Sequence, residues 1–164
     1  TQYTSSAASD VYKRQVCPLM SNEKHFNGRC FRPTMEATPL SEDEAVLLER
    51  GRQDFDNGRF WHAHEAWEDL WNSLKARHAP RAEVLLIQGL IQTAALLYNH
   101  QRKKVRGVTN QWAKLTPKLE PWDVAWGFDI AQHVKNISVF FHDVGEWQQT
   151  YENVRLPRID KEGE

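Results

Sequence analysis

The longest apolar region of the chain, residues 84–98, constrains the fold more than any other feature. It is shorter than the ~20 apolar residues that a membrane-spanning helix needs, and it is interrupted at four positions: Gln88, Gly89, Gln92 and Thr93. A helix over residues 81–105 would be apolar on almost every side, and such a helix belongs in the middle of a bundle. The sequence therefore predicts an all-α fold, a compact bundle of about five helices with a central antiparallel helix hairpin.

Local signals place two helices before this one. Ser41 is followed three residues later by Glu44, which is a capping-box pattern, so a first helix should cover residues 41–56. Asn57-Gly58 supplies a turn, and a second helix should run over about residues 59–77. Pro80 suits the first turn of the central helix.

The chain after the central helix should hold two more helices. Gly107 is predicted to end the central helix, and a fourth helix should cover residues 108–119 with Pro117 as a late kink or stop. Residues 121–127 read as a turn-rich link, and we find no β-hairpin signal. The last helix should pack through an apolar seam at spacings of 4, 3, 4 and 3: Ile130, Val134, Ile137, Phe141 and Val144.

The composition indicates one domain. The 164 residues are 40% hydrophobic and 26% charged, which fits one globular unit with a real core. Residues 1–40 show no helical or strand period and should not fold. Residues 5–15 resemble a translated sequencing-adapter peptide and are excluded from the functional argument, so Met20 or Met35 is a candidate start. The expected domain is residues 41–153, followed by a charged tail, residues 154–164.

Charge and cysteine content exclude some functions. The net charge of -1 provides no overall field that would draw the chain to nucleic acid or to an anionic membrane. The basic run at residues 102–106 is expected to complement a helix dipole rather than to bind nucleic acid. Cys17 and Cys30 form no C-x-x-C pair, which argues against structural zinc and favours a cytoplasmic protein.

The second helix carries the most distinctive residues. Its predicted core stripe has spacings of 4, 3, 4 and 3 and consists of Phe60, His64, Trp67, Trp71 and Leu74. On this pattern His64 points into the core, and Glu68, one turn further on, can meet it. Glu65 turns further toward solvent, and Trp61 is the tryptophan most expected to be exposed.

The central helix carries polar residues where apolar ones would be expected. A tight hairpin of the second and third helices would set Gln88 and Gln92 opposite His64 and Glu68. Buried polar groups need partners, so we expect a hydrogen-bonded network of these four side chains in a tryptophan-lined pocket. The predicted pocket consists of Trp61, His64, Glu68, Trp71, Gln88 and Gln92.

Two runs together resemble the domain of unknown function 309 family: G-R-F-W-H-A-H-E-A-W-E-D-L-W at residues 58–71 and L-I-Q-G-L-I-Q-T-A-A at residues 86–95. The resemblance covers about residues 43–120 and implies a compact α-helical fold. It also implies a set of signature residues: His64, Glu65, Glu68, Trp71, Gln88 and Gly89. The family is loosely described as predicted metal-dependent hydrolases. Where many members carry a histidine near the end of the third helix, this chain has Tyr98, followed by Asn99 and His100.

Three interpretations of the pocket follow. The first is a non-catalytic module that binds a protein or a small ligand. The second is a hydrolase that uses a divalent metal, with His64 and Glu68 as ligands and Glu65 as the base, since H-E-x-x-E differs from the zinc motif H-E-x-x-H by one residue. No second motif supplies a third ligand. In the third interpretation the polar network only stabilises the helix hairpin.

Overall fold

The computed structural model describes residues 35–159. The predictions for the first 34 residues, including the adapter-like segment, Met20 and both cysteines, lie outside the described residues, as does the end of the predicted tail. In the described part, five helices and one short hairpin follow one another: α2 (Glu42–Asp56), α3 (Phe60–Ala76), α4 (Arg81–Gln101), α5 (Val105–Leu119), β1 (Val124–Ala125), β2 (Phe128–Asp129) and α6 (Ile130–His142).

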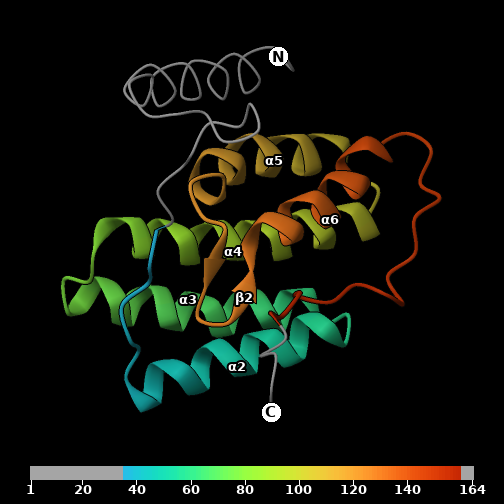
Figure 1. Ribbon diagram of the computed structural model, residues 1–164. Helices are drawn as coiled ribbons and strands as arrows, with labels where there is room; N and C mark the ends of the chain where they lie inside the picture. The colour runs from blue at the N-terminus through green and yellow to red at the C-terminus, as the bar shows by residue number, and fades with distance from the viewer. Residues whose placement is uncertain (1–34, 160–164) are drawn as a thin grey trace, which may run out of the picture. The chain divides into compact units, whose positions relative to one another are not determined.

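The helices pack in sequence order, and this confirms the predicted all-α bundle. In Figure 1, α5, α4, α3 and α2 follow one another from top to bottom, and each packs against the next. The packing of α3 against α4 is the predicted central hairpin, and α4 is buried on most sides. None of the helices in the described part is long and apolar enough to cross a membrane.

Helix α2 begins as its sequence predicts. The Ser41 side chain accepts from the Glu44 N–H, and the Glu44 side chain accepts from the Ser41 N–H at 2.9 Å, which completes the capping box. Arg77, after the end of α3, donates to the buried Glu44 carboxylate at 2.7 Å. The Arg77 guanidinium, despite the opposing effect of burial, holds the pKa of Glu44 below its ordinary value.

Two glycines allow close helix packing. The Trp67 indole covers Gly51, and a Cβ at Gly51 would lie 2.1 Å from its Nε1. Leu119 covers Gly89 in the same way, at 2.6 Å. Glycine at these positions therefore sets the approach of α2 to α3 and of α4 to α5.

The predicted end of the central helix was wrong. Helix α4 ends at Gln101, and α5 begins at Val105, so Gly107 lies inside α5. Backbone N–H groups of residues 102–104 bond to the carbonyls of Asn99 and His100, which closes α4 before the predicted stop. The glycine is needed for packing, because a Cβ at Gly107 would lie 2.3 Å from the Asn99 side chain.

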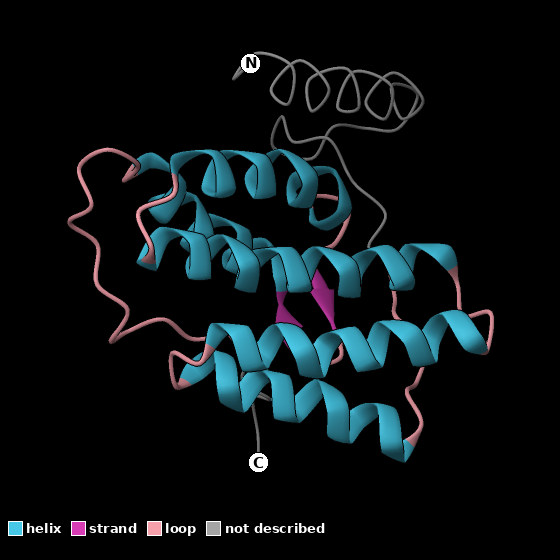
Figure 2. Cartoon of the chain, turned by 180° about the vertical axis from the view of Figure 1, so that it is seen from behind, coloured by secondary structure: helices cyan, strands magenta, loops and turns pink. Residues whose placement is uncertain are grey.

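A small hairpin lies where the sequence showed no hairpin signal, so that prediction was also wrong. Strands β1 and β2 pair antiparallel, and the two residues between them, Trp126 and Gly127, have φ of 49° and 82°. A two-residue hairpin turn of this kind needs positive φ at both central positions. Tryptophan is uncommon at the first central position of such turns, so the Trp126-Gly127 sequence did not indicate a hairpin. From the viewpoint of Figure 2 the strands, in magenta, lie on the far side of the helices.

The seam predicted for the last helix was partly wrong. The residues of α6 that are buried are Ile130, His133, Ile137 and Phe140. Helix α6 ends at His142, so Val144 lies outside it. The apolar pattern passed over His133 because imidazole is polar, yet this side chain is fully buried.

Two segments predicted to lie outside the folded domain pack against it. Thr38 donates to the buried Glu83 carboxylate through its backbone N–H at 2.7 Å and through its hydroxyl. At the other end, Leu156 is buried and its N–H donates to Asp56 at 2.8 Å. The described residues after Val154 are therefore held by specific contacts.

Candidate functional site

A pocket of about 220 Å³ lies between α3, α4 and α5. It contains five of the six residues of the predicted pocket, and Trp61 is the one that does not line it. The lining residues are His64, Glu68, Trp71, Gln88, Ile91, Gln92, Ala95, Gln111 and Lys114. That these residues bind a ligand stays a prediction.

Helix α3 presents three lining residues on successive turns. His64, Glu68 and Trp71 are spaced by four and three positions, so they share one side of the helix. The side that enters the core is the neighbouring one, which carries Phe60, Ala63, Ala66, Trp67, Leu70 and Leu74. His64 and Trp71 thus lie at the edge of the core, and the predicted stripe was wrong for both. The His64 side chain is 19% exposed.

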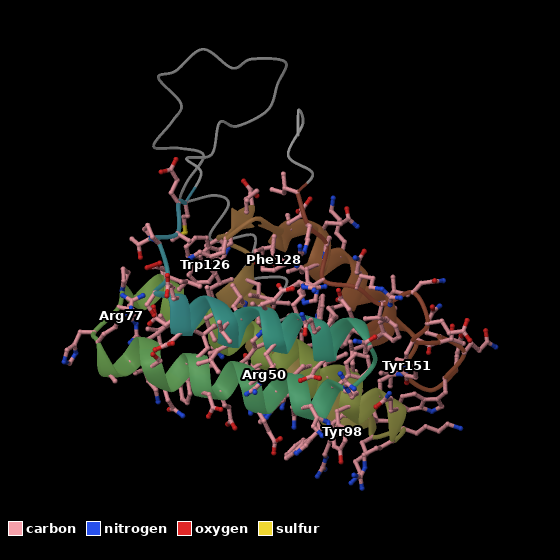
Figure 3. All side chains as sticks on the ribbon, turned by 90° about the horizontal axis from the view of Figure 1, so that it is seen from below. Arg50, Arg77, Tyr98, Trp126, Phe128 and Tyr151 are labelled. Atoms are coloured by element: carbon pink, nitrogen blue, oxygen red, sulfur yellow. The ribbon has the colours of Figure 1, made fainter. Side chains whose placement is uncertain are left out.

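The Trp61 ring and the Glu68 carboxylate are the neighbours of His64 on α3. The Trp61 ring stacks on its imidazole, with centroids 5.0 Å apart and 7° between planes. The Nδ1 of His64 lies 3.7 Å from Glu68 Oε2, which is an ion-pair distance rather than a hydrogen bond. Trp61 itself is 49% exposed, as expected, and contacts Tyr98. Figure 3 shows Tyr98 at the opposite end of the bundle from Arg77.

Glu65 lies outside the pocket. Its carboxylate is exposed and accepts a hydrogen bond from Trp61 Nε1 at 3.2 Å. The base of the predicted hydrolase therefore does not face the lining residues His64 and Glu68. Within residues 35–159 no group of three or more histidine, cysteine, aspartate or glutamate side chains is arranged to hold a metal.

Helix α4 contributes two apolar side chains and two side-chain amides to the lining of the pocket. Ile91 and Ala95 are apolar, and Gln88 and Gln92 lie beside them. Gln92 Oε1 accepts from Lys118 Nζ at 2.9 Å, so it pairs with α5 rather than with His64 or Glu68. Among the described residues, the hydrogen-bonded network of four side chains that we predicted is not formed.

Helix α5 supplies the lining residues that the sequence analysis missed. Gln111 and Lys114 line the pocket, and Lys118 bonds to one of its amides. Nothing in the local sequence shows which side of α5 meets α4, so the sequence analysis did not predict that Lys114 lines the pocket. Polar Gln111 beside buried Leu115 was the one available signal.

The lysines carry positive charge at this site. Burial lowers the pKa of Lys118, and the neighbouring charge of Lys114 lowers it further. Neither lysine is in an ion pair with a carboxylate of the described residues. Lys75 lies 3.3 Å from the centre of the Trp71 ring, so a third cation covers one pocket residue.

Three residues of the lining have buried polar atoms without hydrogen-bond partners. These atoms are His64 Nδ1, Trp71 Nε1 and Gln111 Oε1. Across residues 35–159 only one other buried side-chain atom lacks a partner, Nδ1 of His133. An unpaired buried polar group costs about 1–3 kcal/mol, so the pocket concentrates unused hydrogen-bonding capacity.

Fold and pocket together define a small helical-bundle protein with a polar pocket between three helices. Residues 48–110 match the model of DUF309, a domain of unknown function, and this match confirms the predicted resemblance. The match contains seven of the nine lining residues, and Gln111 and Lys114 follow it. No curated protein and no solved structure matches the chain.

Proposed function

We propose that this protein is a binding module whose pocket between α3, α4 and α5 takes a small organic anion. One observation carries the proposal: three of the four unpartnered buried side-chain atoms in the described residues belong to this pocket. Binding sites combine an apolar wall with a few convergent polar groups. Trp71, Ile91 and Ala95 provide that wall, and the amides and the imidazole provide the polar groups.

The charge around the pocket favours an anion. Lys114 lines it, and Lys118 is hydrogen-bonded to its Gln92 with a pKa lowered by burial. Glu68 is the one carboxylate among the lining residues. A carboxylate or phosphate near the lysines would supply the counter-charge that no described side chain provides.

The size of the pocket limits the ligand. Its volume of about 220 Å³ is below the roughly 300 Å³ at which sites for drug-sized molecules begin. A single small ring or a short chain fits this volume. The indole N–H of Trp71 can donate to such a ligand, and Gln111 Oε1 can accept from it.

The test uses benzoate, acetate and inorganic phosphate as probes, with benzamide as the neutral counterpart of benzoate. Binding to the full chain is measured by NMR titration. Lys114→Gln should weaken benzoate binding several-fold, because it removes one charge beside the pocket. Lys104→Gln is the matched control: it removes the same charge ten residues earlier, about 15 Å along the helix.

The probes also distinguish the kind of anion. Benzoate binding above phosphate indicates a carboxylate with a ring, and phosphate above both carboxylates indicates a phosphate compound. Benzamide binding as tightly as benzoate, or equal loss in Lys114→Gln and Lys104→Gln, would contradict the proposal.

We also propose that the protein works in the cytoplasm. Two cysteines without a C-x-x-C pair suit a reducing compartment. Fractionation of source cells should recover the chain with cytoplasmic markers, and recovery with secreted proteins would contradict this.

A further inference from the structure

A second pocket, of about 280 Å³, lies between α6 and the chain that follows it. Its lining comes from Phe55 in α2, from α6 and from residues 149–155, and it shares no residue with the pocket between α3, α4 and α5. Figure 1 shows the chain leaving α6 and running down the side of the bundle toward α2. An inference about this pocket is therefore independent of the proposed function.

One lining residue of the pocket is the fully buried His133, and the protonation of its imidazole follows from its neighbours. The Thr93 hydroxyl donates to the Leu90 carbonyl at 2.7 Å, which uses its only proton. At 3.0 Å from His133 Nε2 the same oxygen must accept, so Nε2 carries the ring proton. Burial lowers the pKa of His133 to about 3, so the ring is neutral and Nδ1 is a bare acceptor.

His133 Nδ1 is a hydrogen-bond acceptor with no donor. His133 is fully buried, and its Nδ1 has no hydrogen-bond partner. A buried acceptor without a donor is costly, and imidazole accepts readily from hydroxyl and N–H groups. A ligand that brings one donor to this atom would remove that cost.

The outer wall of the pocket is held in place by hydrogen bonds. Asp143 accepts from the Gln149 N–H at 2.9 Å and bonds to His100 Nε2 at 2.8 Å. The other ring nitrogen of His100 bonds to the Tyr151 hydroxyl. Phe140, a lining residue, stacks on Tyr151 with centroids 5.6 Å apart. The pocket is thus preformed, which lowers the ordering cost of binding.

The rest of the lining sets the class of ligand. Phe55, Ile137 and Phe140 are buried and give apolar walls suited to a ring. Apart from Val139, the exposed lining residues are polar or cationic and include Asn136, Gln149, Asn153 and Arg155. No aspartate or glutamate lines the pocket, so its charge disfavours a cation.

We propose that this pocket is a second binding site, which takes a small neutral or anionic aromatic molecule with one hydroxyl or N–H group donating to His133 Nδ1. The ring of the ligand lies against the apolar walls. Its hydroxyl or N–H group makes it bind more tightly than a ring of the same size without such a group.

The experiment compares p-cresol with p-xylene, in which a methyl group replaces the hydroxyl. Binding to the full chain is followed by NMR titration, including the side-chain nitrogens of His133. We expect p-cresol to bind about five-fold more tightly, the ratio that one net hydrogen bond provides. His133 Nδ1 should shift with p-cresol only, and His133→Phe should abolish the preference.

Two variants at exposed valines locate the site without disturbing the core. Val139 lines the pocket and Val46 does not, and both are exposed. Val139→Trp should block p-cresol, whereas Val46→Trp should leave its binding unchanged. Equal binding of p-cresol and p-xylene, no p-cresol binding at millimolar concentration, or normal binding in Val139→Trp would each overturn the proposal. These readouts decide it even where His133→Phe fails to fold.

Discussion

Replacing Gly51 with alanine tests the close contact of α2 with α3. The added Cβ would lie 2.1 Å from Nε1 and 2.3 Å from Cδ1 of Trp67. That ring is fully buried, it packs against Phe55 at 5.7 Å, and its Nε1 donates to the Leu48 carbonyl at 3.2 Å. The ring therefore cannot turn away, and the two helices have to separate.

The expected free-energy change combines three effects. Overpacking costs about 1–3 kcal/mol, and loss of the hydrogen bond to Leu48 costs about 1 kcal/mol. Alanine in a helix gains about 1 kcal/mol over glycine. The balance is a loss of about 1–3 kcal/mol in the free energy of unfolding.

Urea unfolding followed by far-UV circular dichroism measures this loss. Ala113→Gly, at an exposed position in α5, serves as the control, because it should cost only the helix-propensity difference of about 1 kcal/mol. A Gly51→Ala protein that is as stable as the wild type, or more stable, would refute the packing of Trp67 over this glycine.

Three further predictions concern stability. Because burial lowers the pKa of His133 to about 3 and the unfolded residue titrates near 6.5, the unfolded state takes up the proton first. Stability should therefore fall as pH decreases from about 6.5 toward 3, by up to ~1.4 kcal/mol per pH unit; urea midpoints at several pH values should show this slope reduced in His133→Gln. Tyr151→Phe removes the hydroxyl that bonds to His100 Nδ1 and should lower the free energy of unfolding in urea by about 1–3 kcal/mol; an unchanged midpoint would contradict the contact. Ser41→Ala removes the N-cap of α2 and should lower the free energy of unfolding by about 1 kcal/mol, with a matching fall in the thermal midpoint. Ser138→Ala is the control: this serine lies inside α6 and caps no helix, so the thermal midpoint should change little.

Structural features that depend on residues close together in the sequence were predictable. The capping box at Ser41 and the turn at Gly58 set the ends of α2 and the start of α3, because each is decided within a few residues. The apolar content of residues 84–98 placed α4 in the centre of the bundle. Spacing on α3 and α4 also identified five residues of the pocket between α3, α4 and α5.

Features decided by tertiary contact were not predictable. Gly107 looks like a helix end, and only the Asn99 side chain across the interface explains why glycine lies inside α5. The buried His133 donates a hydrogen bond from Nε2 to Thr93 on α4, and this pairing spans 40 residues of sequence. Gln111 and Lys114 reach the pocket because α5 packs on α4. Sequence periodicity shows which side of a helix is apolar but not which helix covers it.

The measurement that tests the proposed function most directly is an NMR titration of the full chain with benzoate, read at the indole N–H of Trp71. This N–H is buried in the lining and has no hydrogen-bond partner, so a bound carboxylate should produce a large, saturable shift. The shift should need a higher benzoate concentration in Lys114→Gln and the wild-type concentration in Lys104→Gln. A Trp71 signal that stays unchanged with benzoate, acetate and phosphate alike would contradict the account of this pocket as an anion-binding site.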